Sequence, residues 1–228
     1  MSKTLIQDYL NTQGLRLPVE MVQVAYLTLG AVFNVAEVDN LPTNLWQDPS
    51  VGFDATSFLN ESVDANQLLR SVYAVLDSTL ERFPAKVAFY MTADRAVHTE
   101  LALQRVWHNQ VNLPATLQAA EHGHLQLYRA AETGWGRLID NGQHWRQMGE
   151  ISEAESHLGW SQMLLPVCAP TGAVLGMLCV TSPEAHAFDD DAKAWWVAAS
   201  LVLADAVYNF FPPTWWEQED NDDIPTGN

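Results

Sequence analysis

The chain has 228 residues, of which 48% are hydrophobic, and its nine tryptophans and eight phenylalanines are more than a disordered chain would carry. Its 28 acidic and 11 basic residues give a net charge of −17, which repels nucleic-acid phosphates and anionic lipid headgroups, so neither nucleic acid nor a membrane is an expected partner. Two cysteines do not make a disulfide scaffold, and the amino terminus has no secretion signal, so we expect a cytoplasmic protein.

Residues 1–60 are predicted to form an N-terminal extension that is partly helical. Ser2 can cap a helix over residues 2–13, whose apolar side chains share one face and which Gly14 can end. A second element runs from Pro18 to about Ala36, and its apolar residues fit either a buried helix or a strand. Residues 39–58 are rich in Asn, Pro, Asp and Gly and are predicted to form a loop.

The elements from residue 61 to residue 160 have clearer patterns. A helix is predicted from Asp64 to about Arg82, because leucines and valines recur on one of its faces. Strands are predicted over residues 86–92 and 100–107, and a helix over 117–131 is expected to end at Thr133-Gly134. The stretch 135–149, rich in Gly and Trp, contributes a strand-like segment.

A hairpin gives the strongest local pattern in the chain. Its strands cover residues 161–167 and 173–181, and Pro170-Thr171-Gly172 form the turn between them. An acid-capped helix over 192–211 follows, and its apolar run is interrupted by three polar residues, so it is expected to be a buried helix and not a membrane span. We therefore predict an α+β domain over residues 61–213, with an antiparallel sheet and helices packed on it, and an acidic disordered tail over 214–228.

Three segments in this domain also resemble those of a known family. They are Ser161–Val167 (SQMLLPV), Gly172–Ser182 (GAVLGMLCVTS) and Ala187–Asp191 (AFDDD). The chain resembles the GAF domain family, a PAS-like sensory fold, where these places read S-x-L-x-V-P-V, G-x-x-x-G-V-L-x-V-x-S and A-F-x-x-x-D. Residues 130–134 and 139–141 look like the mid-domain elements of that family. The resemblance spans about residues 64–213 and implies a stand-alone, bacterial-type GAF protein with a regulatory, non-catalytic role.

The resemblance also places a candidate ligand pocket beneath the stretch that begins at Trp135. Aromatic side chains there supply stacking surface, and arginine and histidine supply oriented donors, so an anionic or aromatic small molecule would fit. The alternative is that the tryptophans fill a core or a dimer seam. The cofactor is left open, and the predicted ligand-binding residues are Trp135, Arg137, Asn141, His144, Trp145 and Arg146, with Tyr90 and Trp107 as the floor if they share a face.

Two other functions are weighed against a sensor. The resemblance extends to GAF-type free methionine-R-sulfoxide reductases, which use cysteines, so Cys168 and Cys179 are the candidate residues of the runner-up function. The hairpin places Cys168 opposite about Leu175 and Cys179 four residues further, roughly 13 Å away, whereas a disulfide requires α-carbons within about 7 Å. The other alternative, an IclR-type transcription regulator, needs a DNA-binding extension, but residues 1–60 hold two basic against six acidic residues.

The last helix is apolar on more than one face, so a sheet alone cannot cover it. Either residues 1–36 or a second subunit must pack there, and we expect a homodimer. The predicted dimer-interface residues are Trp195, Trp196, Leu203 and Phe210. The acidic tail is a candidate binding segment for a protein partner. His122 and His124 could bind a metal, but two histidines without a third ligand do not predict a metal site.

Overall fold

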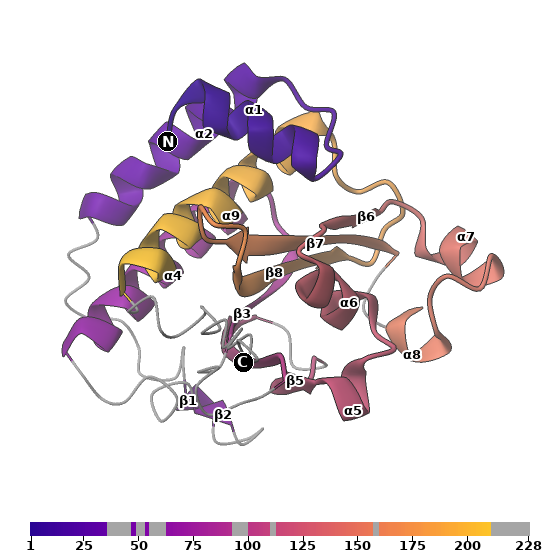
Figure 1. Cartoon of the computed structure of the whole chain (residues 1–228). Helices are drawn as coiled ribbons and strands as arrows, with labels where there is room; N and C mark the ends of the chain where they lie inside the picture. The colour runs from indigo at the N-terminus through magenta and orange to yellow at the C-terminus, as the bar shows by residue number, and fades with distance from the viewer. Residues whose placement is uncertain are drawn as a thin grey trace, which may run out of the picture.

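An antiparallel sheet of six strands organises the chain, with the strand order β5-β4-β3-β8-β7-β6 (Figure 1). The computed structural model describes residues 1–35, 47–48, 53–54, 63–92, 100–109, 113–156 and 160–210. The strands are β3 (Lys86–Thr92), β4 (Ala102–His108), β5 (Thr116–Gln118), β6 (Arg137–Ile139), β7 (Ser161–Cys168) and β8 (Val174–Ser182). A separate short pair is formed by β1 (Gln47–Asp48) and β2 (Phe53–Asp54).

The four longest described helices lie on one face of this sheet (Figure 1). We call this face the helix face. They are α1 (Lys3–Thr12), α2 (Val19–Val35), α4 (Val63–Arg82) and α9 (Asp190–Phe210). Their apolar side chains and those of the strands, among them Phe89, Leu165 and Leu178, form the larger core. Ile6 of α1 and Val22 of α2 belong to the same core, so the first 35 residues pack as part of the main fold.

The opposite face, which we call the pocket face, carries a smaller core and shorter helices. Tyr90, Leu103 and Met177 of the sheet pack there against Leu127 and Tyr128. The helices on this side are α5 (Ala119–His122) and α6 (Gln126–Thr133), and α7 (Gly142–Gln147) and α8 (Glu153–Ser156) lie in the connection from β6 to β7. None of the helices in the described part of the chain is long and apolar enough to span a membrane.

The predicted hairpin is confirmed and centres the sheet. β7 and β8 pair from Ser161 opposite Ser182, and Gly172 in the turn has a φ of +91°, which glycine adopts without strain. Gly176 lies where β8 passes β3, and a Cβ at this position would stand 2.2 Å from the carbonyl oxygen of Tyr90. The antiparallel α+β class is therefore as the sequence predicted.

The structure decides one prediction that the sequence left open and contradicts another. The ambiguous second element is a helix, α2. The single helix expected over 117–131 is wrong: β5, α5 and α6 occupy this stretch, because Leu117 pairs with Leu103 at the edge of the sheet. Gly123 then separates α5 from α6, since a Cβ there would lie 2.7 Å from the carbonyl oxygen of Ala119. Most of the predicted loop 39–58 and the predicted tail 214–228 lie outside the described residues.

The chain itself covers the apolar last helix. α9 packs against α2, α4 and the sheet, and Trp196 and Leu203 are fully buried while Trp195 is nearly so. Of the two alternatives, residues 1–36 or a second subunit, the described fold shows the first. Trp196 and Leu203 are therefore not available to a second subunit, which removes them from the expected dimer interface, and Phe210 is partly buried against the same core.

Candidate functional site

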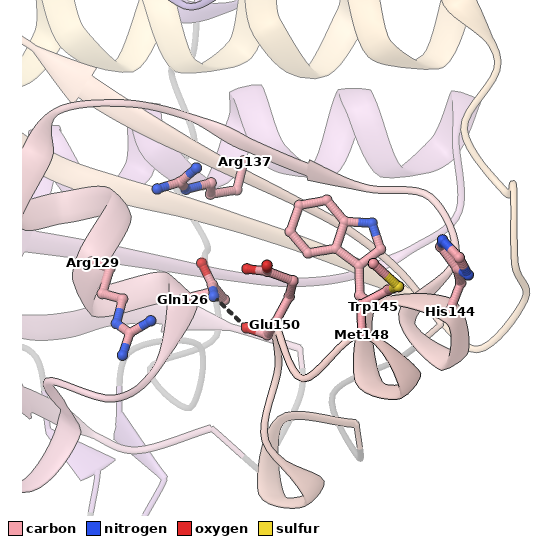
Figure 2. A pocket seen from close by; sticks show the side chains of 7 residues that line it. All are labelled: Gln126, Arg129, Arg137, His144, Trp145, Met148 and Glu150. Carbon is pink, nitrogen blue, oxygen red and sulfur yellow. Dashed lines mark hydrogen bonds between the residues drawn. The ribbon is translucent and has the colours of Figure 1, made fainter.

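A pocket of about 390 Å³ opens on the pocket face, between α6, the start of β6 and the connection that carries α7 and α8 (Figure 2). We call residues 142–156 of this connection the flap. The walls of the pocket come from α6, β6 and the flap, which follow one another along the chain before β7. The lining residues are Gln126, Arg129, Arg137, His144, Trp145, Met148 and Glu150.

The position of Arg137 follows from how β6 begins. Gly134 ends α6 in the left-handed conformation with a φ of +67°, and the chain then enters β6, where Arg137 pairs with Leu164 of β7. The side chain of Gln13, at the end of α1, holds this turn from outside. Its Nε2 donates to the carbonyl of Gly134 at 2.9 Å, and its Oε1 accepts from the backbone N–H of Gly136.

Helix α7 brings three lining residues to the pocket. The side chain of Asn141 caps this helix by accepting a hydrogen bond from the backbone N–H of His144 at 3.1 Å. The N–H of Gly142 donates to the carbonyl of Trp160 at 2.6 Å, which fixes the start of α7 beside β7. With α7 so placed, His144, Trp145 and Met148 all line one wall (Figure 2).

A buried carboxylate fastens the flap to α6. Glu155 is 3% exposed, and it accepts hydrogen bonds from the backbone N–H of Gln126, from the backbone N–H of Ser152 at 2.9 Å and from the Ser152 hydroxyl at 3.1 Å. The Gln126 side chain donates to the carbonyl of Glu150 at 2.7 Å (Figure 2). From the sheet, Gln162 donates to the carbonyl of Glu155 at 3.4 Å. Gln126 therefore both lines the pocket and holds the flap.

The pocket concentrates positive charge in an acidic protein. No carboxylate of the described residues lies within ion-pair distance of Arg129 or Arg137, and the same holds for Arg16, Arg70 and Lys86. The two pocket arginines differ from these in facing one cavity together. Arg129 donates from Nε to the carbonyl of Gly123 at 3.3 Å, and the Nε of Arg137 is buried without a hydrogen-bond partner among the described residues. The exposed Glu150 is the one carboxylate of the lining.

Three of the eight predicted ligand-binding residues, Arg137, His144 and Trp145, line the pocket. The structure does not bring the other five there. Trp135 is 61% exposed, Asn141 caps α7, and Arg146 forms an ion pair with Glu153 at 3.1 Å.

Tyr90 and Trp107 do not form a shared floor, because they point to opposite faces of the sheet. Tyr90 belongs to the core of the pocket face, whereas Trp107 belongs to the core of the helix face. The strand register shifts between Phe89 and Tyr90, so Tyr90 pairs with Arg105 and Phe89 with Trp107. The Tyr90 hydroxyl donates to the carbonyl of Pro114 at 2.6 Å, and burial raises the pKa of Tyr90 far above its usual range.

Sequence reasoning missed four lining residues: Gln126, Arg129, Met148 and Glu150. Gln126 and Arg129 are three residues apart and share a face of α6, a spacing visible in the sequence once the helix is placed correctly. The same reasoning missed Arg105, which is almost fully buried and donates to the carbonyl of Leu113.

The two cysteines are free and far apart in the strand register. Cys179 pairs with Leu164, which is four residues from Cys168 on the same strand, as the sequence predicted. Burial raises the pKa of Cys168 to about 11 and that of Cys179, which is fully buried, to about 12. Because the thiolate is the reactive form of cysteine, these environments disfavour nucleophilic chemistry.

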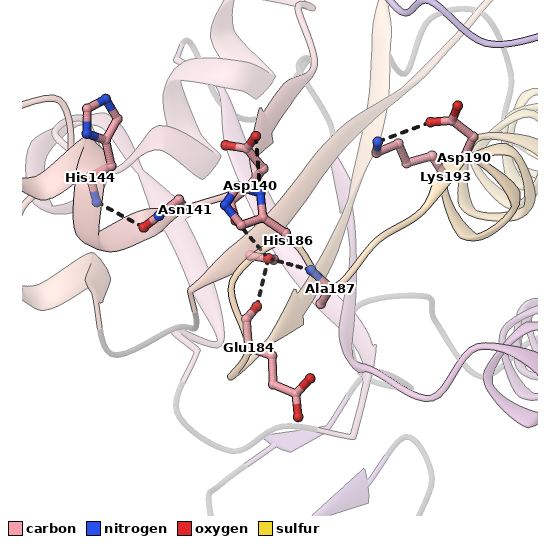
Figure 3. A network of polar contacts seen from close by, with 9 residues as sticks. Asp140, Asn141, His144, Glu184, His186, Ala187, Asp190 and Lys193 are labelled. Carbon is pink, nitrogen blue, oxygen red and sulfur yellow. Dashed lines mark hydrogen bonds and ion pairs between the residues drawn. The ribbon is translucent and has the colours of Figure 1, made fainter.

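Asp140 and His186 lie together near the start of β7 (Figure 3). The Ser161 hydroxyl donates to the backbone carbonyl of Asp140 at 3.1 Å. The Ser161 hydroxyl is buried, lies 2.7 Å from the carbonyl of Glu184 and accepts from the N–H of Ala187 at 3.1 Å. His186 Nδ1 lies 3.7 Å from a carboxylate oxygen of Asp140, and both side chains are exposed. Ser161 contacts backbone groups, so this network shapes the loop before α9 and has no nucleophile aimed at a substrate. Within the described ranges no three potential metal ligands gather.

The fold is GAF-like, an antiparallel six-stranded sheet with helices packed on it. It is similar to a GAF sensor protein from Burkholderia vietnamiensis, with a TM-score of 0.51 and 15% identity over 83% of this chain and 97% of that one. It is also similar to the type II free methionine-R-sulfoxide reductase from Thermoplasma acidophilum, with a TM-score of 0.52 and 14% identity over 65% of this chain and 97% of that one. No protein-family model and no curated protein matches the chain. At these identities the likeness concerns the fold, which sensors and reductases share.

Proposed function

We propose that this protein is a cytoplasmic, non-catalytic sensor that binds a small organic anion beneath the flap and acts on a protein partner in trans. The observation that carries the proposal is the pair of arginines, Arg129 and Arg137, that face one pocket without a carboxylate partner among the described residues. Arg129 is exposed, whereas Arg137 is half-buried. A half-buried guanidinium has lost part of its hydration, so an anion that supplies charge-assisted hydrogen bonds stabilises it.

The rest of the lining suits the body of such a ligand. Trp145 and Met148 offer an aromatic face and a flexible thioether, and a volume of about 390 Å³ admits a metabolite-sized molecule. The carboxylate of Glu150 repels an anion. Because Glu150 is exposed, solvent and salt screen this repulsion more strongly than they screen the attraction between the anion and the half-buried Arg137.

Ligand binding would also act on the flap. The side chain of Gln126 holds the carbonyl of Glu150, and both residues line the pocket. A ligand that contacts α6 and α7 together would stabilise one position of the flap relative to the sheet. This is a change that a partner protein can recognise, and it requires no chemistry at the site.

The reductase function is the second candidate, supported by the similarity of the fold to such an enzyme. The described pocket does not favour it, because neither cysteine lines it and burial raises the pKa of both. Thiol-dependent turnover of free methionine sulfoxide that is lost in Cys179→Ser would overturn our assignment.

The test is a thermal-shift screen with carboxylates, nitrate, phosphate and cyclic nucleotides, each beside a neutral or cationic analogue. An anion at 100 times its dissociation constant should add about 2.7 kcal/mol to the free energy of unfolding. Arg137→Gln should abolish the shift, whereas Arg146→Gln, which removes an exposed guanidinium outside the pocket lining, should retain it. Glu150→Gln should tighten binding, since it removes the carboxylate that opposes the ligand. If no anion binds, or if Glu150→Gln weakens binding, the proposal is wrong.

A further inference from the structure

The lining of the pocket divides into a polar end and an apolar end. The polar end is formed by α6, β6 and the part of the flap that follows α7, and its residues are Gln126, Arg129, Arg137 and Glu150. The apolar end comes from α7 and the residue that caps its end, which contribute Trp145 and Met148. Figure 2 shows the polar residues on one side of the view and these two on the other. A ligand that fills the whole pocket is therefore charged at one end and apolar at the other.

The apolar end favours a flat ring. The indole of Trp145 is half-buried on a helix whose start is fixed by the Asn141 cap, so it offers a stacking surface that is already in place. Met148 lines the same end, and a thioether makes favourable contacts with the edge of an aromatic ring. The Met148 side chain is 66% exposed, so the free protein leaves apolar surface there for a ligand to cover.

The charges of the lining favour a ligand with a single negative charge. Arg129 and Arg137 are positive and Glu150 is negative, so with histidine counted as neutral the lining carries one net positive charge. A monoanion cancels this charge. A dianion would leave one negative charge unbalanced beside the carboxylate of Glu150.

The polar end also suits the geometry of a carboxylate. The planar fork of a guanidinium matches the two oxygens of a carboxylate, which lie in one plane with the ring when the acid is aromatic. Arg137 retains a buried Nε–H without an acceptor among the described residues. The described part of the fold therefore does not saturate this guanidinium with its own acceptors.

We propose that the ligand is an arene carboxylate, an aromatic ring with one carboxylate group, whose ring lies against Trp145 and whose carboxylate meets Arg137 and Arg129. This inference rests on the proposed function, because it names the class of anion that the sensor binds. Trp145 selects for the ring, and Glu150 selects against a second charge. An aliphatic acid would lose the stacking contact, and a neutral aromatic molecule would lose the contact with the arginines.

The test compares benzoate with three analogues in calorimetric and NMR titrations of the full chain. Acetate lacks the ring, benzamide lacks the charge, and phthalate carries a second carboxylate at the same end. Benzoate should bind about tenfold more tightly than each of them, or better. Trp145→Leu should weaken benzoate about three- to tenfold and leave acetate unchanged. The matched control is Trp135→Leu, which removes a tryptophan that is 61% exposed outside the lining and should change neither affinity.

Glu150→Gln tests the selection by charge. It should raise the affinity for phthalate by a larger factor than the affinity for benzoate, because the dianion then meets two arginines and no carboxylate. Circular dichroism establishes that each variant folds, and the comparison of the four ligands on the wild-type chain needs no variant.

The outcomes separate this inference from the proposed function. The ligand class is wrong if acetate or phthalate binds as tightly as benzoate, if Trp145→Leu affects acetate and benzoate equally, or if Glu150→Gln does not favour phthalate. In each of these cases the anion sensor still stands, provided that Arg137→Gln abolishes the binding. If none of the three anions binds and the wider screen is also negative, both proposals fail.

Discussion

Replacing Glu155 by alanine should release the flap from α6. The Glu155 carboxylate is 3% exposed and accepts three hydrogen bonds, from the N–H of Gln126 and from the N–H and hydroxyl of Ser152. The two bonds from Ser152 lie within the flap, and the bond from Gln126 is the one that joins it to α6. A hydrogen bond to a charged group contributes about 1.5–3 kcal/mol net, so we expect a loss of about 2 kcal/mol in the free energy that holds the flap. Glu155→Gln should lose less, since its amide oxygen still accepts one of these hydrogen bonds.

The flap can open without unfolding the whole chain, so the assay must be local. Hydrogen exchange resolved by segment, and limited proteolysis, should show residues 142–156 opening in Glu155→Ala at a denaturant concentration where β7 and β8 remain protected. Glu153→Ala is the matched control, because Glu153 lies two residues away but is exposed and holds only Arg146. An exposed ion pair contributes about 0–1 kcal/mol. Equal protection in the two variants would refute the role of Glu155 as the anchor.

Two further predictions concern the hairpin. With pKa values of about 11 and 12, both Cys168 and Cys179 are neutral thiols at pH 8. Alkylation, followed by mass spectrometry, should therefore be slow at pH 8 and accelerate as the pH rises towards 11, first at Cys168. Rapid labelling at pH 7 would contradict the burial of the thiols. Gly176→Ala should destabilise the fold by about 3 kcal/mol or more in chemical denaturation, because its Cβ would meet the backbone of Tyr90. Gly30→Ala, in α2 with open space around it, should be neutral or stabilise by up to about 1 kcal/mol, and equal effects of the two substitutions would argue against the close approach.

The sequence predicted the fold where local patterns and long-range pairing agree. The alternation in residues 161–167 and 173–181, with a turn that ends in Gly172, defines a hairpin without reference to the rest of the chain, and Asp189 caps the last helix as its position indicates. The prediction failed over residues 117–131, because β5 exists only through its pairing with β4 and no local pattern distinguishes it from the first turn of a helix. The homodimer and the domain boundaries stay predictions.

The same distinction explains which site residues were found. His144 and Trp145 lie next to each other in a polar and aromatic stretch, and Arg137 lies in the strand just before it. The family resemblance pointed to this stretch, and its composition supplied the residues. Arg129 belongs to α6, and it reaches the pocket only because the sheet brings α6 beside β6. The face of the sheet to which Trp107 points could not be predicted. Phe89 pairs with Trp107 and Tyr90 with Arg105, so β4 has one extra residue there, and this bulge turns Trp107 to the other face.

The pocket and the outer face of α2 lie on opposite sides of the sheet, yet a short path joins them. Gln13, which follows α1, holds the carbonyl of Gly134 and the N–H of Gly136, and the next residue is Arg137 of the pocket. In the other direction only residues 14–18 separate Gln13 from α2. Any shift of β6 on binding an anion would therefore bear on α1 and α2. Because coupling between two sites is reciprocal, a partner protein that recognised such a shift would alter the affinity for the anion by the same factor that the anion alters the binding of the partner.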